Sequence, residues 1–171
     1  MFSAFSILLS FCKESKFKGL SQIISWSIAD EGKGHSDAGC DLFKDLVKEE
    51  GITQDEIELI IGGFNNVLQN EYAFLNNVFG SLTHINNLPK EAFMEFLKYR
   101  YNNRLENLGI SPKYYLDYNK DLSFQISSWF EPMTSGNISQ DFFAYNKDGS
   151  QYASKPTFDI SNINWNNLVL T

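Results

Sequence analysis

Residues 23–43 of the chain read IISWSIADEGKGHSDAGCDLF and place a Trp, an Asp, a Glu and a His on one amphipathic helix. A Glu and a His that are three or four positions apart lie on nearly the same helical face, so Glu31 and His35 can both point into a core. Flanking apolar residues extend this helix from about Leu20 to Glu50, where Gly51 ends it. Bundles that hold two metal ions use Glu-x-x-His pairs and further Glu residues on neighbouring helices. The stretch therefore predicts an all-α bundle with a metal site.

The spacing between Glu31 and His35 is one residue longer than in a Glu-x-x-His pair. In a regular α-helix the extra residue displaces the His by about 1.5 Å along the axis and about 100° around it. A one-residue π-bulge would absorb that displacement, and such bulges are common at functional sites. Gly32 and Gly34 make the segment easy to deform, since each glycine costs about 1 kcal/mol in a helix interior.

Other helices are predicted before and after this stretch. Residues 2–15 read as an apolar, buried helix, too short to span a membrane and without the basic start of a signal peptide. Thr53 and Glu56 form a capping box, after which apolar residues recur at helical spacing as far as Val78. A last helix follows Pro89 and ends near Gly109. The chain therefore reads as four helices.

Two polar residues on these segments have structural interpretations. Glu71 lies on the apolar stripe before Val78, where a hydrogen-bonded structural acid is more common than a metal ligand. His84 lies in a polar connection with no Glu three or four positions before it, so we expect a solvated loop histidine. We expect Trp26 to be a core residue rather than a redox-active one.

The chain divides into three parts by pattern. Residues 1–112 form the half-bundle, residues 113–150 an irregular arm with no convincing strand pattern, and residues 151–171 a tail rich in Asn and Ser with isolated apolar anchors. Such a tail is typical of a segment that orders on a partner.

Charge and cysteine content limit the partners and the compartment. The net charge of −7 and the pI near 4.8 argue against binding to nucleic acid or to an anionic membrane, since both require basic surface. Cys12 and Cys40 have apolar neighbours and are expected to be buried thiols in a reducing cytoplasm.

The opening stretch also resembles a ligand helix of the small, radical-generating subunit of class I ribonucleotide reductase. That helix reads Arg-Asp-Glu-x-x-His, often preceded by Ser-Trp-Ser-Val and followed by Ser-Asp-Ala-Gly. Here Ala29 replaces the Arg, and one extra residue precedes the His. Residues 99–109, 141–143 and 150–155 are similar to later motifs of the family. The resemblance covers nearly the whole chain but only the C-terminal half of the family's subunit, which implies a partial ferritin-like bundle with an extended C-terminal tail.

The resemblance implies roles for four residues. Glu31 and His35 would be ligands of a di-iron or iron/manganese centre, and Asp30 would hydrogen-bond a metal-bound His and help to relay a radical. Tyr152, with Tyr145 as the competing candidate, would pass the radical to the large subunit. Without the resemblance, the same residues would be ordinary polar or packing residues.

The resemblance also implies partners. The remaining metal ligands would come from a missing N-terminal half, which would share the metal centre with this chain, and the tail would dock on the large subunit. A homodimer of bundles in the cytoplasm is expected. The alternative is a non-catalytic remnant that binds the large subunit without metal, which Ala29 and the altered spacing favour. Another di-metal oxidase is a third possibility, against which the Tyr152 tail argues.

Overall fold

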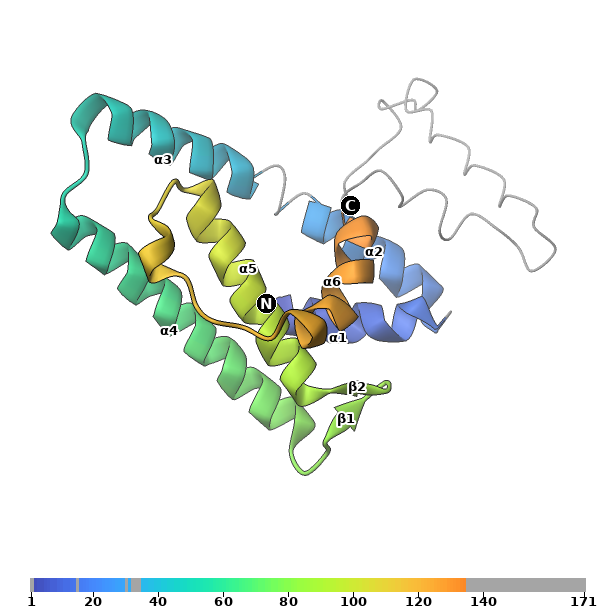
Figure 1. Cartoon of the computed structure of the whole chain (residues 1–171). Helices are drawn as coiled ribbons and strands as arrows, with labels where there is room; N and C mark the ends of the chain where they lie inside the picture. Colours follow the sequence, from blue (N-terminus) through green and yellow to red (C-terminus); the bar gives the residue numbers. More distant parts are fainter. Residues whose placement is uncertain (1, 15, 30, 32–34, 135–171) are drawn as a thin grey trace, which may run out of the picture. The chain divides into compact units, whose positions relative to one another are not determined.

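The computed structural model describes residues 2–14, 16–29, 31 and 35–134, all within one compact unit, Met1–Ser139. This part of the chain is helical, which confirms the all-α class (Figure 1). Its helices are α1 (Phe2–Lys13), α2 (Lys18–Ala29), α3 (Ser36–Glu50), α4 (Gln54–Phe79), α5 (Lys90–Asn107) and α6 (Lys120–Thr134). None of the helices in these residues is both long and apolar enough to cross a bilayer.

The prediction of one continuous α-helix from about Leu20 to Glu50 is wrong. The structure has two α-helices there, α2 and α3, and between them the backbone at Glu31 and His35 is π-helical. Each π turn takes one residue more than an α turn. These two π-helical residues bound the stretch in which the sequence has one residue more than a Glu-x-x-His pair.

Helix α1 packs against α2, α4, α5 and α6, which confirms its prediction as a buried helix. Its buried face carries three serines, and small side chains of this kind let neighbouring helices approach closely. The hydroxyl of Ser6 donates to the carbonyl of Ser3 at 2.9 Å, and that of Ser10 to Ile7 at 2.6 Å. These hydroxyl groups are therefore buried with their hydrogen bonds made.

Helices α4 and α5 form an antiparallel pair that holds much of the aromatic core. The predicted capping box is confirmed, since Thr53 accepts from the amide of Glu56 and the Glu56 carboxylate accepts from the amide of Thr53. Along the pair, Phe79 meets Phe93 at a ring distance of 5.7 Å. The buried apolar residues of the two helices are Leu68, Leu75, Phe79, Ala92, Phe93, Phe96, Leu97, Tyr101 and Leu105.

A short hairpin that the sequence pattern did not reveal joins α4 to α5. Strands β1 (His84–Ile85) and β2 (Leu88–Pro89) pair antiparallel, with His84 opposite Pro89. The two residues between the strands, Asn86 and Asn87, have positive φ values of 52° and 62°. This is the geometry of a tight hairpin turn, which Asn tolerates better than most residues.

The expected irregular arm over residues 113–150 contains a helix, α6, which packs closely on α5. Asn119 opens it, because its side chain accepts from the amide of Leu122 at 3.1 Å. The buried residues of α6 recur at helical spacing: Ser123, Ile126, Trp129, Phe130 and Met133. Pro132 lies within the last turn of α6. Because proline usually interrupts a helix, the sequence around it does not predict one.

Candidate functional site

The two predicted ligands, Glu31 and His35, lie at the junction of α2 and α3. Both side chains are exposed in this chain. His35 occupies the N-cap position of α3, and its side chain forms no capping hydrogen bond there. The carboxylate and the imidazole are therefore presented at a helix end rather than enclosed by the helices that the structure describes.

The π-helical backbone at Glu31 and His35 affects where the two residues lie relative to each other on the helix. A residue inserted as a π-bulge leaves the residues on either side in the register that they would have without it. Across such a bulge, a separation of four residues corresponds to a separation of three in a regular α-helix. The structure has π-helical backbone at both Glu31 and His35, as that adjustment requires.

The other predicted site residues lie outside the described residues. Asp30, which follows α2, is one of them, and so are Tyr145 and Tyr152. The backbone of Trp26 is part of α2, while its side chain is not described. The predicted roles of Asp30 and Tyr152 therefore rest on the sequence.

Carboxylate oxygen and imidazole nitrogen suit a di-iron or iron/manganese centre, so Glu31 and His35 are chemically appropriate ligands. Within the described part of the chain, no three His, Cys, Asp or Glu residues gather as a metal site. The donor types of Glu31 and His35 therefore fit such a centre, whereas the described residues alone do not form a complete ligand set.

Glu71 is a structural acid, as its sequence context indicated. It is only 8% exposed, and its carboxylate accepts hydrogen bonds from the backbone N–H of Ser3 at 3.0 Å and from the Ser3 hydroxyl. Burial alone would raise the pKa of Glu71, but hydrogen bonds and positive charge at the amino end of α1 lower it overall. The carboxylate thus caps α1 from a different helix.

A second charged group at the amino end of α1 comes from α5. The Arg100 guanidinium lies 5.2 Å from the ring centroid of Phe2, and its Nη1 is 3.5 Å from Oε1 of Glu131. The same Glu131 oxygen accepts from the Tyr99 hydroxyl at 2.9 Å. Burial, followed by the positive charge of Arg104, lowers the pKa of Arg100. Helices α4, α5 and α6 therefore each contribute a charged residue near the start of α1.

Two buried polar groups have no hydrogen-bond partner among the described residues: Nε of Arg100 on α5 and the hydroxyl of Tyr72 on α4. Burial, and then the negative charge of Glu95, raise the pKa of Tyr72 to about 12. Its phenol therefore stays protonated at neutral pH. Neither group carries a pattern that could have been recognised in the sequence.

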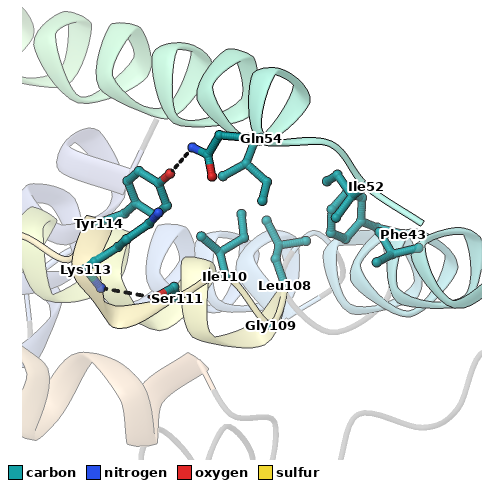
Figure 2. A pocket seen from close by; sticks show the side chains of 11 residues that line it. Phe43, Ile52, Gln54, Leu108, Gly109, Ile110, Ser111, Lys113 and Tyr114 are labelled. Atoms are coloured by element: carbon teal, nitrogen blue, oxygen red, sulfur yellow. Dashed lines mark hydrogen bonds between the residues drawn. The ribbon is translucent and has the colours of Figure 1, made fainter.

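A pocket of about 300 Å³ lies where the α3–α4 connection meets the segment after α5 (Figure 2). It is lined mainly by apolar side chains, including those of Phe43, Ile52 and Ile110, and the Gln54 amide donates to the Tyr114 hydroxyl at its edge. No His, Cys, Asp or Glu lines it. Because it offers no metal ligand, it is separate from the chemistry predicted for Glu31 and His35.

His84 is exposed, as predicted for a solvated histidine, although it lies in strand β1 rather than in a loop. Its Nδ1 is 3.0 Å from the hydroxyl of Thr83. These observations leave Glu31 and His35 as the candidate ligand pair among the described residues.

The comparisons with known proteins agree with the resemblance. The family model described as "Ribonucleotide reductase, small chain" matches residues 1–120. The chain is 30% identical over 120 residues to the probable ribonucleoside-diphosphate reductase small subunit 048L of Invertebrate iridescent virus 3. That match covers 67% of this chain and 31% of the relative, so the chain spans about a third of the length of the curated relative it matches. The search of solved structures found no significant match. The chain belongs to the small-chain family of ribonucleotide reductase.

Proposed function

We propose that this chain supplies the C-terminal portion of a class I ribonucleotide reductase small subunit and supports the reduction of ribonucleotides to deoxyribonucleotides. The family match over residues 1–120 carries the proposal. The wider backbone turn at Glu31 and His35 supports it, because it offsets the extra residue that had argued against metal binding. The helical fold is consistent with the ferritin-like bundle of the family.

Glu31 and His35 are proposed as two ligands of a di-metal centre, iron or iron/manganese. Such a centre supplies the dioxygen-derived oxidising power for radical formation when it is bound. The role of Glu31 is to hold a metal ion through its carboxylate, and that of His35 is to hold one through an imidazole nitrogen. Asp30 would hydrogen-bond a metal-bound imidazole and fix its orientation.

The remaining ligands would come from a complementary N-terminal half. The exposure of Glu31 and His35 supports a site that other helices complete, because a bundle encloses its metal between facing helices. Two donors are too few to hold a di-metal centre, so we expect little or no metal on this chain by itself.

The tail would connect this site to the large subunit. Tyr152 is the proposed relay residue, and the apolar residues after it, such as Trp165 and Leu168, would dock on the large subunit. A homodimer of bundles in the cytoplasm is the assembly that we propose for the complete protein.

Elemental analysis of bound metal tests this function. The chain is purified alone and after co-expression with the helices that would complete the bundle, each as wild type and as Glu31→Ala. We expect about two metal ions per bundle in the wild-type complex only. The matched control is Glu50→Ala, an exposed glutamate at the end of α3, which should load normally.

The rival function is that of a non-catalytic protein that binds the large subunit without metal. A complex that forms, binds the large subunit and holds no metal would favour that rival. Full metal occupancy in the Glu31→Ala complex would contradict the ligand assignment while leaving the family function in place.

A further inference from the structure

Arg104 of α5 forms an ion pair with Asp37, which lies in the first turn of α3. Nη1 of Arg104 donates to Oδ1 of Asp37 at 3.2 Å, between residues that are 67 positions apart in the sequence. Within the described part of the chain, this is the one hydrogen bond or ion pair that joins α3 to another helix. Asp37 follows His35 by two residues. The ion pair therefore holds α3 at the end that carries the proposed metal ligand.

Packing alone gives this end of α3 little support. No residue of α3 is buried, and its other ion pairs join residues of α3 itself. Phe43 and Val47, which line the apolar pocket, lie about two turns or more beyond the start of the helix. Burial of apolar residues is what normally stabilises a helix within a protein. A directional polar contact therefore matters more at the start of α3 than it would on a buried helix.

The other partner, Arg104, lies on a helix that is firmly packed. Its side chain is 16% exposed, and its neighbours Tyr101 and Leu105 are buried at 6% and 0% exposed. Arg104 lies in the last turn of α5, where a positive charge is favourable, and Asp37 lies in the first turn of α3, where a negative charge is favourable. Each charge is therefore stabilised both by its own helix end and by its partner.

Asp37 and His35 lie on different sides of the chain. At about 100° per residue, a separation of two residues turns the side chain by about 200° around the helix axis. Arg104 therefore holds α3 from the side roughly opposite the His35 side chain, which is exposed. The imidazole is left accessible to other helices while the backbone beneath it is held.

The ion pair also limits where the extra residue between Glu31 and His35 can be accommodated. Before the junction, Ile28 of α2 is 6% exposed, and α2 packs on α1 and α6. After the junction, Asp37 is held by Arg104. The wider turn therefore has to form between Ile28 and Asp37, where the backbone is π-helical at Glu31 and His35.

We propose that Arg104 and Asp37 are positioning residues for His35. The inference rests on the proposed function, because it gives the pair a task in the metal site of that function. Neither residue contacts the metal in this proposal, and Arg104 acts through Asp37 on the backbone that carries His35. Asp37 is 52% exposed, and such ion pairs contribute little to overall stability. The main effect is geometric, since metal–ligand distances are held to within about 0.2 Å.

NMR relaxation of the full chain without metal tests the positioning. Selective ¹⁵N labelling of histidine gives two backbone signals, those of His35 and His84. We expect an order parameter near the rigid value of about 0.85 for His35 in the wild type, and below about 0.6 in Arg104→Met and in Asp37→Asn. The value for His84 on β1 should not change. The double variant should equal either single variant, because two residues that act as one unit do not have additive effects.

Matched controls remove an ion pair that lies within one helix. Asp41→Asn breaks the contact with Lys44 on α3, and Lys98→Met breaks that with Glu95 on α5, each at 2.7 Å. Both controls should leave His35 rigid.

Metal binding by the co-expressed complex is the second measurement. In titrations with Mn²⁺, Arg104→Met and Asp37→Asn should each weaken binding about two- to fivefold, the effect expected for loss of a partly exposed ion pair. The two control variants should bind Mn²⁺ as the wild type does.

Four outcomes would overturn the proposal. They are an unchanged order parameter of His35 in both single variants, an equal loss of rigidity in Asp41→Asn, additive effects in the double variant, and a mobile His35 without weaker metal binding. A wild-type complex that holds no metal would instead contradict the proposed function. The NMR comparison would then still decide whether the ion pair holds His35, because it is made without metal.

Discussion

The carboxylate of Glu71 accepts hydrogen bonds from both the backbone N–H and the hydroxyl of Ser3, 68 residues earlier in the chain. The first N–H groups of a helix have no partner within that helix, and a negative charge beside them is favourable. A residue of α4 thus acts as an N-terminal cap for α1. These hydrogen bonds hold the start of α1 against α4.

Replacing Glu71 by Ala should destabilise the chain. The substitution leaves the buried N–H and hydroxyl of Ser3 without their acceptor and removes a helix cap, which together cost about 2–3 kcal/mol. Urea unfolding, followed by circular dichroism, should show a lower midpoint. The control is Gln69→Ala, an exposed position two residues earlier on the same helix, which should change the unfolding free energy by less than about 0.5 kcal/mol. An equal effect of the two substitutions would contradict the capping role.

The stability of the chain should also decrease as the pH is lowered through the pKa of Glu71. The pKa of Glu71 in the folded chain lies below its ordinary value of 4.5, so its contribution is complete above that value and is lost as the pH falls through the folded pKa. One such group adds a slope of at most about 1.4 kcal/mol per pH unit. Unfolding curves measured from pH 6 to pH 3 should show this additional slope in the wild type and not in Glu71→Gln. Parallel pH profiles for the two proteins would rule out the contribution.

The sequence predicted the helices whose signals are local. Thr53 and Glu56 are three residues apart, so their capping box could be recognised without knowing the fold. The hairpin depends on two consecutive Asn residues with positive φ, a conformation that Asn adopts only in some contexts. Helix α6 has a helical period of buried residues, but Ser123 and Pro132 within it made the pattern resemble a loop.

The sequence predicts only those parts of the candidate site whose residues are close together in the chain. Glu31 and His35 are predictable as a candidate ligand pair because they are close in sequence, and the one residue in excess between them predicts a π-bulge. The capping contact between Glu71 and Ser3 joins distant segments, so no local pattern reveals it. The same holds for the contact of Arg100 with Phe2 and Glu131, which three different helices bring together.

Asn102 should hold the segment between α5 and α6 in place. Its amide donates to the carbonyl of Leu116 at 2.9 Å, and its side-chain oxygen accepts from the amide of Leu116 at 2.8 Å. Asn102→Ala removes both bonds at a buried position and should cost about 2 kcal/mol. Hydrogen exchange should then become faster at the Leu116 amide, while Asn107→Ala, exposed on the same helix, should leave it protected. Unchanged protection in Asn102→Ala would show that the segment is held by other contacts.

Deleting Lys33 should test whether the π-helical geometry compensates for the extra residue. The deletion restores the Glu-x-x-His spacing, which a regular α-helix accommodates. Metal loading of the co-expressed complex should therefore equal that of the wild type. Inserting an Ala after Lys33 lengthens the spacing by one more residue and should abolish loading. Loss of metal on deletion would mean that the wider turn itself is required.

Tyr152→Phe should separate radical transfer from metal binding. A phenol can give up its hydrogen atom and carry a radical, whereas the benzyl ring of Phe cannot do so under the same conditions. Because Tyr152 lies far along the chain from Glu31 and His35, its loss should leave metal content and circular dichroism unchanged. We expect ribonucleotide reduction by the reconstituted complex with the large subunit to fall at least about a thousandfold, equivalent to about 4 kcal/mol in the barrier. The matched control is Tyr145→Phe, the competing relay candidate, which should retain turnover. Normal turnover in Tyr152→Phe, with loss in Tyr145→Phe, would move the relay to Tyr145, and normal turnover in both variants would remove the relay from this tail.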